Sequence, residues 1–270
     1  MPLITRPISL LGGRVLRTVE FIGGMGYLVR DAAVALPLAL LGKRGRRLGW
    51  TNLWAQMVRV GVKSIGIVSL VVFCIGSILA LQIAPILADY GVVSQVADII
   101  AIAMFRELGP LVSAIVLTGF AGASIAAEIG TMVVSEEIEA LEAQAIAPVR
   151  FLVVPRVLAT TVMMVCLAVV GDLMGVFGGA LIASTSLDIS LRQYFDRTFD
   201  AVQMKDFITG LIKAGVFGAL ISSLACYLGL GVTGGAQGVG NATTRTVVLT
   251  IVALILVDLM FTAAFYYLNL

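Results

Sequence analysis

Two long runs without a charged residue constrain this chain more than any other feature of its sequence. One run covers Ser64 to Ala88 and has 25 residues, and the other covers Leu108 to Ala127 and has 20. A helix needs about 20 apolar residues to cross the hydrocarbon core of a bilayer, so both are long enough. Because 60% of the residues are hydrophobic and only 13% are charged, we expect an all-α, polytopic integral membrane protein. Further apolar segments at Val157–Leu187, Phe207 to about Leu228, and Thr246–Leu270 bring the expected number of transmembrane helices to five.

Basic residues before the first run predict the orientation of the chain. By the positive-inside rule they place the N-terminus in the cytoplasm, and five spans then place the C-terminus outside. We expect residues 1–63 to form a cytoplasmic, interfacial segment and residues 64–270 to form the membrane domain. The run from Ala32 to Leu41 is too short to span and contains Pro37, so it predicts an in-plane elbow helix, with a flexible tail as the alternative. The basic residues are Arg14, Arg17, Arg30, Lys43, Arg44, Arg46, Arg47, Arg59 and Lys63.

A short acidic helix is predicted between the second and third spans, over residues 135–147. Ser135 is a suitable N-cap and Pro148 disfavours helix at its end. Apolar Ile138 and Leu141 share one side, so that side can pack against a partner. The polar side carries carboxylates, which fits a basic protein surface better than anionic lipid, although an interfacial connector remains the alternative. These carboxylates belong to Glu136, Glu137, Glu139 and Glu142.

Charged residues within the predicted spans are candidates for function, because a charge in the bilayer is costly. The alternative explanation for each of them is that it forms one half of a structural ion pair. We expect Lys213 to lie near the outer end of the fourth span, where its stem can reach the interface. The full set is Arg106, Glu107, Glu128, Asp172, Lys213, Arg245 and Asp258.

The first span has an apolar face that ends near the outer surface. Leu79, Ile83, Ile86, Leu87 and Tyr90 follow the spacing of one helix face. Without further evidence, ordinary lipid-facing side chains are the simpler explanation of this face.

Several kinds of chemistry are not supported by the sequence. The chain has no histidine, no Walker phosphate loop and no G-x-S-x-G, so we expect neither an enzyme nor a metal site. Its three cysteines lie in apolar runs and are expected to be core residues. Residues 229–234 read GLGVTG, but they follow an apolar helix, so we interpret Gly229–Thr244 as a mobile cytoplasmic loop and not as a dinucleotide site.

Several ordered motifs in the chain resemble the permeases of the MlaE (maintenance of lipid asymmetry) family. They are residues 106–110 (RELGP), 127–132 (AEIGTM), 136–141 (EEIEAL), 155–156 (PR) and 242–248 (ATTRTVV). The resemblance implies a permease of an ATP-driven phospholipid transporter, with the coupling helix at 135–147. It also implies a homodimer whose outward-facing cavity holds phospholipid. The matching lipid-binding positions are Leu79, Ile86, Leu87, Tyr90 and Glu107.

The same resemblance implies partners and a location. They are a cytoplasmic ABC ATPase that binds ATP and Mg²⁺, a periplasmic MCE-domain ring and, in some systems, a STAS-domain protein, all at the bacterial inner membrane. Neither a cofactor in this chain nor a nucleic-acid partner is expected. One rival is a proton-coupled secondary transporter that relays protons through Glu107, Asp172 and Asp258. Another is a membrane scaffold that transports nothing.

Overall fold

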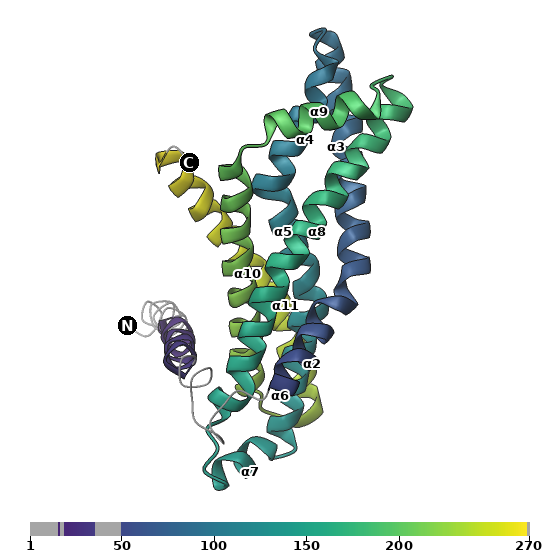
Figure 1. The fold of residues 1–270 in the computed structure, drawn as a ribbon. Coiled ribbons are helices and arrows are strands. Elements are labelled where there is room, and N and C mark those ends of the chain that lie inside the picture. Colours follow the sequence, from purple (N-terminus) through teal and green to yellow (C-terminus); the bar gives the residue numbers. More distant parts are fainter. Residues whose placement is uncertain (1–15, 17–18, 36–49, 269–270) are drawn as a thin grey trace, which may run out of the picture.

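The computed structural model describes residue 16, residues 19–35 and residues 50–268. These residues form helices and connecting turns and contain no strand (Figure 1). Within this described part, five helical segments are long and apolar enough to cross a membrane. The prediction of an all-α polytopic membrane protein with five spans is therefore confirmed. The segments are Asn52–Asp89, Val93–Val134, Val149–Ser186, Met204–Leu230 and Gly235–Leu268.

The first span is longer than its uncharged run. Helix α2 (Trp50–Val60) leads through a 3₁₀ turn, η1 (Val62–Ser64), into α3 (Ile65–Asp89). The helix therefore begins in the basic region before the predicted start at Ser64, and α2 packs against the third span. Arg59 and Lys63, which we used to orient the chain, thus stand on the first helical segment itself.

The second span is a helix interrupted by two π-helical turns. The chain runs from η2 (Val93–Gln95) and α4 (Val96–Ala103) into the first π turn, η3 (Met104–Leu108), and then α5 (Gly109–Leu117). Pro110 explains the first turn, because proline has no backbone N–H to donate to the preceding turn. The second π turn, η4 (Thr118–Gly122), precedes α6 (Ala123–Val134).

The predicted helix over residues 135–147 is only partly correct. Helix α7 covers Glu137–Ala143, and left-handed residues lie on both sides of it: Glu136 has φ 60° and Ala145 has φ 58°. Ser135 does not cap the helix. Its backbone N–H donates to Thr131 at the end of α6 (2.9 Å), so the chain must turn before a new helix begins. Helix α7 forms the lower tip of the molecule in Figure 1.

The third span lies at the centre of the bundle. After the π turn η5 (Val149–Val153), helix α8 (Val154–Ser186) packs against α3, α5 and the fourth span. The contact with α3 is close because Gly76 faces Gly175, and a Cβ built at Gly76 would lie 1.9 Å from the Gly175 carbonyl oxygen. Ser77 Oγ donates across the same contact to the Gly178 carbonyl at 3.1 Å. Small residues thus allow the two spans to pack by shape, as is common in lipid.

The segment that connects the third and fourth spans is helical. Helix α9 (Leu191–Ala201) begins at Ser190, whose hydroxyl accepts a hydrogen bond from the Gln193 backbone N–H. It lies across the end of the bundle opposite α7 (Figure 1). Helix α10 (Met204–Leu230) follows and begins with a capping box between Gln203 and Asp206.

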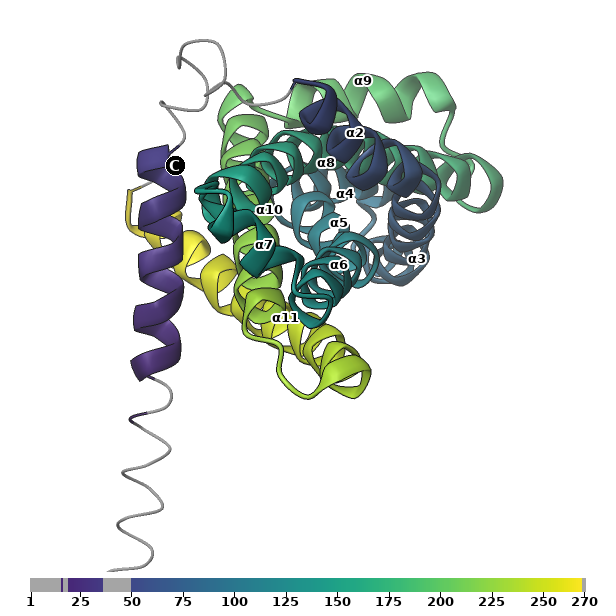
Figure 2. The same cartoon turned by 90° about the horizontal axis from the view of Figure 1, so that it is seen from below.

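The last span begins earlier than predicted. Helix α11 covers Gly235–Leu268, so the expected mobile loop over Gly229–Thr244 is wrong from residue 235 onward. The chain reverses at Gly234 (φ 88°) and Gly235 (φ 66°), where glycine permits a left-handed backbone. Helix α11 then diverges from the bundle toward the C-terminus (Figures 1 and 2). A narrow buried stripe faces the bundle and includes Thr246, Thr250, Leu254 and Asp258.

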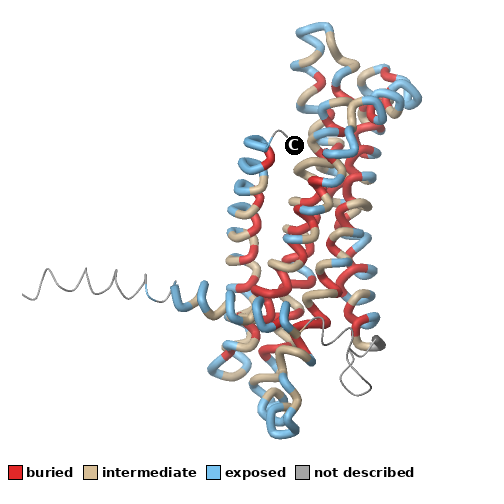
Figure 3. Tube along the Cα trace, turned by 60° about the vertical axis from the view of Figure 1, so that its left-hand side comes forward, coloured by how far each residue is buried: buried red, intermediate tan, exposed pale blue. Residues whose placement is uncertain are grey.

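Residues 19–35 form a helix that lies across the spans rather than along them (Figures 2 and 3). This direction is the one expected of an in-plane elbow helix. The aromatic ring of Phe21 packs edge-on against Tyr227 of α10, with ring centroids 5.2 Å apart. Of the run that suggested the elbow, residues 36–41, including Pro37, lie outside the described residues.

Candidate functional site

A buried cluster of charged residues joins the second, fourth and fifth spans. Lys213 Nζ on α10 lies 2.5 Å from Glu107 Oε2 on η3 and 2.9 Å from Asp258 Oδ1 on α11. It also donates to Thr262 Oγ1 at 2.9 Å, and Thr262 donates in turn to Glu107 Oε1 at 3.2 Å. Three residues of the predicted intramembrane set are therefore brought together at one place. We call Glu107, Lys213, Asp258 and Thr262 the carboxylate–lysine cluster.

The burial of this cluster corrects one prediction. The Lys213 side chain is only 1% exposed, so it does not reach the interface along its stem as expected. It turns inward because two carboxylates compensate its charge, which would otherwise be very costly in a buried site. With two carboxylates and one ammonium the cluster is formally −1, and Glu107 remains 31% exposed. The π turn at 104–108 therefore presents a partly accessible carboxylate whose other side is held by Lys213 and Thr262.

Arg106, the neighbour of Glu107, faces a different partner. Its Nη1 atom lies 3.5 Å from Asp206 Oδ1 at the start of α10. Asp206 also accepts a hydrogen bond from the Gln203 backbone N–H within the capping box. Arg106 thus ties the second span to the beginning of the fourth, which gives it a structural role.

The predicted lipid-binding residues of the first span lie along α3 and just beyond it. Leu79 and Leu87 are half-buried against the core, whereas Ile86 and Tyr90 are exposed. Helix α3 packs mainly against α8, with smaller contacts to α4 and α5. The interactions of Glu107 instead come from α10 and α11. Within one chain, therefore, Glu107 is held by α10 and α11, whereas the α3 residues pack mainly against α8.

A second charged cluster lies toward the end of the bundle that carries α7. Glu128 on α6 pairs with Arg59 on α2 and with Arg156 on α8, the latter at 3.2 Å. Arg59 also donates to Ser124 at 3.0 Å. Since three helices meet at one carboxylate, a structural role explains Glu128. Arg59 served only to orient the chain and Arg156 only as part of a motif, and nothing in the sequence indicated that they meet.

Asp172 differs from the other buried carboxylates. The residue is 1% exposed on α8, and no described residue forms a hydrogen bond with its Oδ1 atom or an ion pair with its carboxylate. The side chain is accommodated beside Gly109 of α5, where a built Cβ would lie 1.7 Å from that oxygen. No ion pair to Asp172 occurs in the described part of the chain, so the structural pairing that explains Glu128 and Asp258 does not explain Asp172.

The acidic helix α7 presents the two kinds of side chain that the sequence predicted. Ile138 and Leu141 are half-buried, while Glu136, Glu137 and Glu142 are exposed. The apolar pair is too small to be a core and lies at the tip of the bundle (Figure 1). A helix of this kind can dock on another protein with its apolar side.

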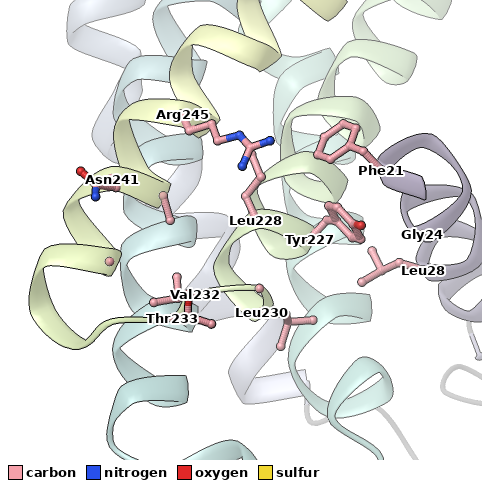
Figure 4. Close-up of a pocket in the computed structure, with 13 residues that line it drawn as sticks. Phe21, Gly24, Leu28, Tyr227, Leu228, Leu230, Val232, Thr233, Asn241 and Arg245 are labelled. Atoms are coloured by element: carbon pink, nitrogen blue, oxygen red, sulfur yellow. The ribbon is translucent and has the colours of Figure 1, made fainter. Parts of the chain in front are cut away.

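Arg245 lines a cavity of about 630 Å³ between residues 19–35, the end of α10 and the first part of α11. The guanidinium lies over the Phe21 ring, 5.9 Å from its centroid. Figure 4 shows Arg245 directed toward Phe21 and Tyr227, whereas Asn241 points away from them. Arg245 is therefore separate from both charged clusters.

Thr262 is the member of the carboxylate–lysine cluster that sequence reasoning missed. It lies four residues after Asp258, hence on the same helix face, and this spacing was the available signal. A threonine in an apolar span otherwise draws no attention.

Comparison with known proteins gives consistent matches over most of the chain. The family model described as Permease MlaE matches residues 53–264. A Rickettsia felis protein named "Probable ABC transporter permease protein" is 38% identical over 211 residues, which are 78% of this chain and 82% of the relative. A Haemophilus influenzae protein named "Intermembrane phospholipid transport system permease protein MlaE" is 30% identical over 265 residues, covering 98% and 99% of the two chains.

Proposed function

The chain belongs to the MlaE permease family, and from this premise we propose that it is the membrane subunit of an ATP-driven phospholipid transporter. The observation that carries the proposal is the match to the Haemophilus influenzae phospholipid transport permease over nearly the whole of both chains. The five spans and the short helix between the second and third support a permease. As a permease the chain is not itself an enzyme, and ATP and Mg²⁺ would be bound by a separate ATPase subunit.

In this proposal the substrate is a phospholipid held in an outward-facing cavity at the interface of a permease homodimer. The exposed and half-buried residues of α3 support it, because an apolar wall suits acyl chains. Ile86 is 58% exposed and Tyr90 is 78% exposed in the single chain, so both are available to a lipid or to a second copy. In the dimer, Glu107 and the apolar α3 residues would line the same cavity.

Glu107 would contribute to the cavity as a fixed negative group. Lys213 and Thr262 hold one side of its carboxylate, so the side chain has little freedom to rearrange. Its exposed side can accept a hydrogen bond from the headgroup of the lipid, and the formal charge of the cluster favours a cationic donor such as an ammonium group.

Helix α7 would transmit the ATPase motion to the spans. Ile138 and Leu141 would pack in a groove of the ATPase, and Glu136, Glu137 and Glu142 would face its basic residues. Closure of the ATPase on ATP would move α7, and the second and third spans, which flank it, would carry that movement to the cavity. The left-handed residues that flank α7 support this role, because they fix how the helix projects.

Partners and orientation complete the proposal. The permease dimer would lie in the bacterial inner membrane with two ATPase subunits on the cytoplasmic side, where α7 lies. The N-terminus would be cytoplasmic and the C-terminus periplasmic. A periplasmic MCE-domain ring would receive or deliver lipid at the α9 end, and a STAS-domain protein would bind the ATPase.

Filling the cavity tests the lipid site. Leu79→Trp and Leu87→Trp should each lower the amount of phospholipid that co-purifies with the assembled complex, because the indole takes the volume of an acyl segment. Leu181→Trp is a matched control, since Leu181 lies on α8 and is already exposed. Native mass spectrometry measures bound lipid. Full lipid occupancy in both cavity variants would remove the α3 site from the proposal.

Asp172, which forms no ion pair with the described residues, supports one alternative function, a proton-coupled secondary transporter. A buried carboxylate whose charge no described residue neutralises can gain and lose a proton, as a member of a proton relay must. Asp172 and the carboxylate–lysine cluster would then carry protons, and transport would not need an ATPase.

A further inference from the structure

The cavity around Arg245 combines one positive charge with apolar and aromatic walls (Figure 4). Phe21 and Leu28 of the N-terminal helix form one wall, and Tyr227 and Leu230 of α10 form another. Helix α11 supplies Arg245. The volume of about 630 Å³ is in the range of sites for small ligands.

The charge of Arg245 has no matching carboxylate among the described residues. In the part of the chain that the structure describes, no Asp or Glu oxygen lies within 4 Å of its guanidinium, which instead lies over the Phe21 ring. Three other cations on the spans are neutralised by carboxylates, since Arg59 and Arg156 pair with Glu128 and Lys213 pairs with Glu107. The cavity is thus lined by a cation that the described part of the fold does not neutralise.

Three features place this cavity at the level of lipid headgroups. Arg245 directly precedes an uncharged run of 12 residues, 246–257, which is the part of α11 that enters the hydrocarbon. Tyr227 lies near the end of α10, where an amphipathic ring favours the interface. The helix of residues 19–35 lies across the spans and exposes apolar side chains such as Ile22 and Val34, as a helix in the interface plane does.

We propose that this cavity binds one anionic glycerophospholipid from the leaflet on the α7 side of the membrane. Its phosphate would accept two hydrogen bonds from the Arg245 guanidinium, which suits phosphate geometry. Its glycerol and upper acyl segments would pack against Phe21, Leu28 and Tyr227. The bound lipid would fasten the N-terminal helix to α10 and α11. This site is separate from the outward-facing transport cavity, and the proposal does not depend on transport.

A reporter placed in the cavity wall tests the proposal. The chain has two tryptophans, Trp50 and Trp54, which are replaced by phenylalanine, and Phe21→Trp then places a single indole beside Arg245. The variant is reconstituted in phosphatidylcholine nanodiscs that contain a small fraction of brominated phosphatidylglycerol or, separately, brominated phosphatidylcholine. Bromine quenches the indole on contact. We expect stronger quenching by phosphatidylglycerol, and Arg245→Gln should reduce this preference about tenfold, as expected for one charge-assisted contact.

Matched variants separate binding from unfolding. Arg192→Gln should change nothing, because Arg192 is almost fully exposed on α9 at the opposite end of the bundle. Arg245→Lys keeps the charge and should retain part of the preference even if the glutamine variant does not fold. Equal quenching by the two lipids in the reporter protein would overturn the proposal. So would displacement of the lipid by inorganic phosphate, since the ligand would then be a free anion.

Discussion

Neutralising Lys213 and Glu107 separately should give unequal losses of stability, and the order follows from the charges of the cluster. Lys213→Met removes the ammonium and leaves two carboxylates, Glu107 and Asp258, facing each other with a formal charge of −2. Glu107→Gln instead leaves Lys213 paired with Asp258 at 2.9 Å, so the remaining pair is neutral. We therefore expect Lys213→Met to be much the more harmful change.

The magnitudes follow from burial and distance. Lys213 is 1% exposed and lies within 3 Å of two carboxylates, and removing one member of such a buried group costs about 3–5 kcal/mol. Glu107 is partly exposed, and the amide oxygen introduced by Glu107→Gln can still accept the Lys213 and Thr262 hydrogen bonds, so the cost should be about 1 kcal/mol. Adding Asp258→Asn to Lys213→Met removes one of the unpaired carboxylates and should recover about half of the loss.

Unfolding in mixed micelles, followed by far-UV circular dichroism, measures these differences as a double-mutant cycle. Leu256→Met is a control, because Leu256 is an exposed apolar residue on the same helix as Asp258. A Lys213→Met protein as stable as the Glu107→Gln protein would refute the charge argument. Failure of Asp258→Asn to restore stability would refute the pairing of Lys213 with Asp258.

Three further predictions concern topology, coupling and backbone strain. The topology is tested by single cysteines in a background without the native ones. Gln193→Cys on α9 should react with a membrane-impermeant thiol reagent in intact spheroplasts, whereas Gln144→Cys after α7 should react only once the membrane is permeabilised. The reverse pattern would show that the orientation of the chain is opposite to the one proposed. Replacing Ile138 and Leu141 together by Asp should abolish co-purification of the ATPase, because two charges would be buried in the interface, while the permease should still fold. A double variant that still binds the ATPase and still moves lipid would disprove the role of α7. Ala145→Gly should raise the melting temperature of the permease by relieving about 1 kcal/mol of left-handed strain, and an unchanged or lower value would contradict the φ of 58°.

The sequence predicted the spans well because their signal is long and local. An uncharged run of 25 residues such as 64–88 has few alternatives to a transmembrane helix. The ends of the transmembrane helices were harder to predict, because a helix can continue through polar residues beyond the bilayer. Residues 235–244 illustrate this, because six glycines between 229 and 240 suggested a loop. Only Gly234 and Gly235 have a left-handed φ there, and helix α11 already begins at Gly235.

The sequence predicted which charged residues are candidates for the site but not which of them lie together. Charged residues in apolar spans identified Glu107, Lys213 and Asp258 one by one, but their meeting depends on the packing of three helices that are distant in sequence. For the same reason the inward turn of Lys213 was missed, since nothing local indicates which side of α10 holds the carboxylates. The shortness of α7 depends on how α6 ends at Val134, which is also a matter of backbone hydrogen bonds rather than of composition.

The central claim is that ATP hydrolysis drives phospholipid transport by this permease, and reconstituted transport tests it most directly. The permease is placed in proteoliposomes with or without its ATPase, and movement of fluorescent phospholipid to acceptor vesicles is measured with ATP, with a non-hydrolysable ATP analogue, and with a protonophore. We predict transfer that requires ATP hydrolysis and is unaffected by collapse of the proton gradient. Transfer that continues without the ATPase but stops when the proton gradient is removed would contradict the account and favour proton coupling through Asp172.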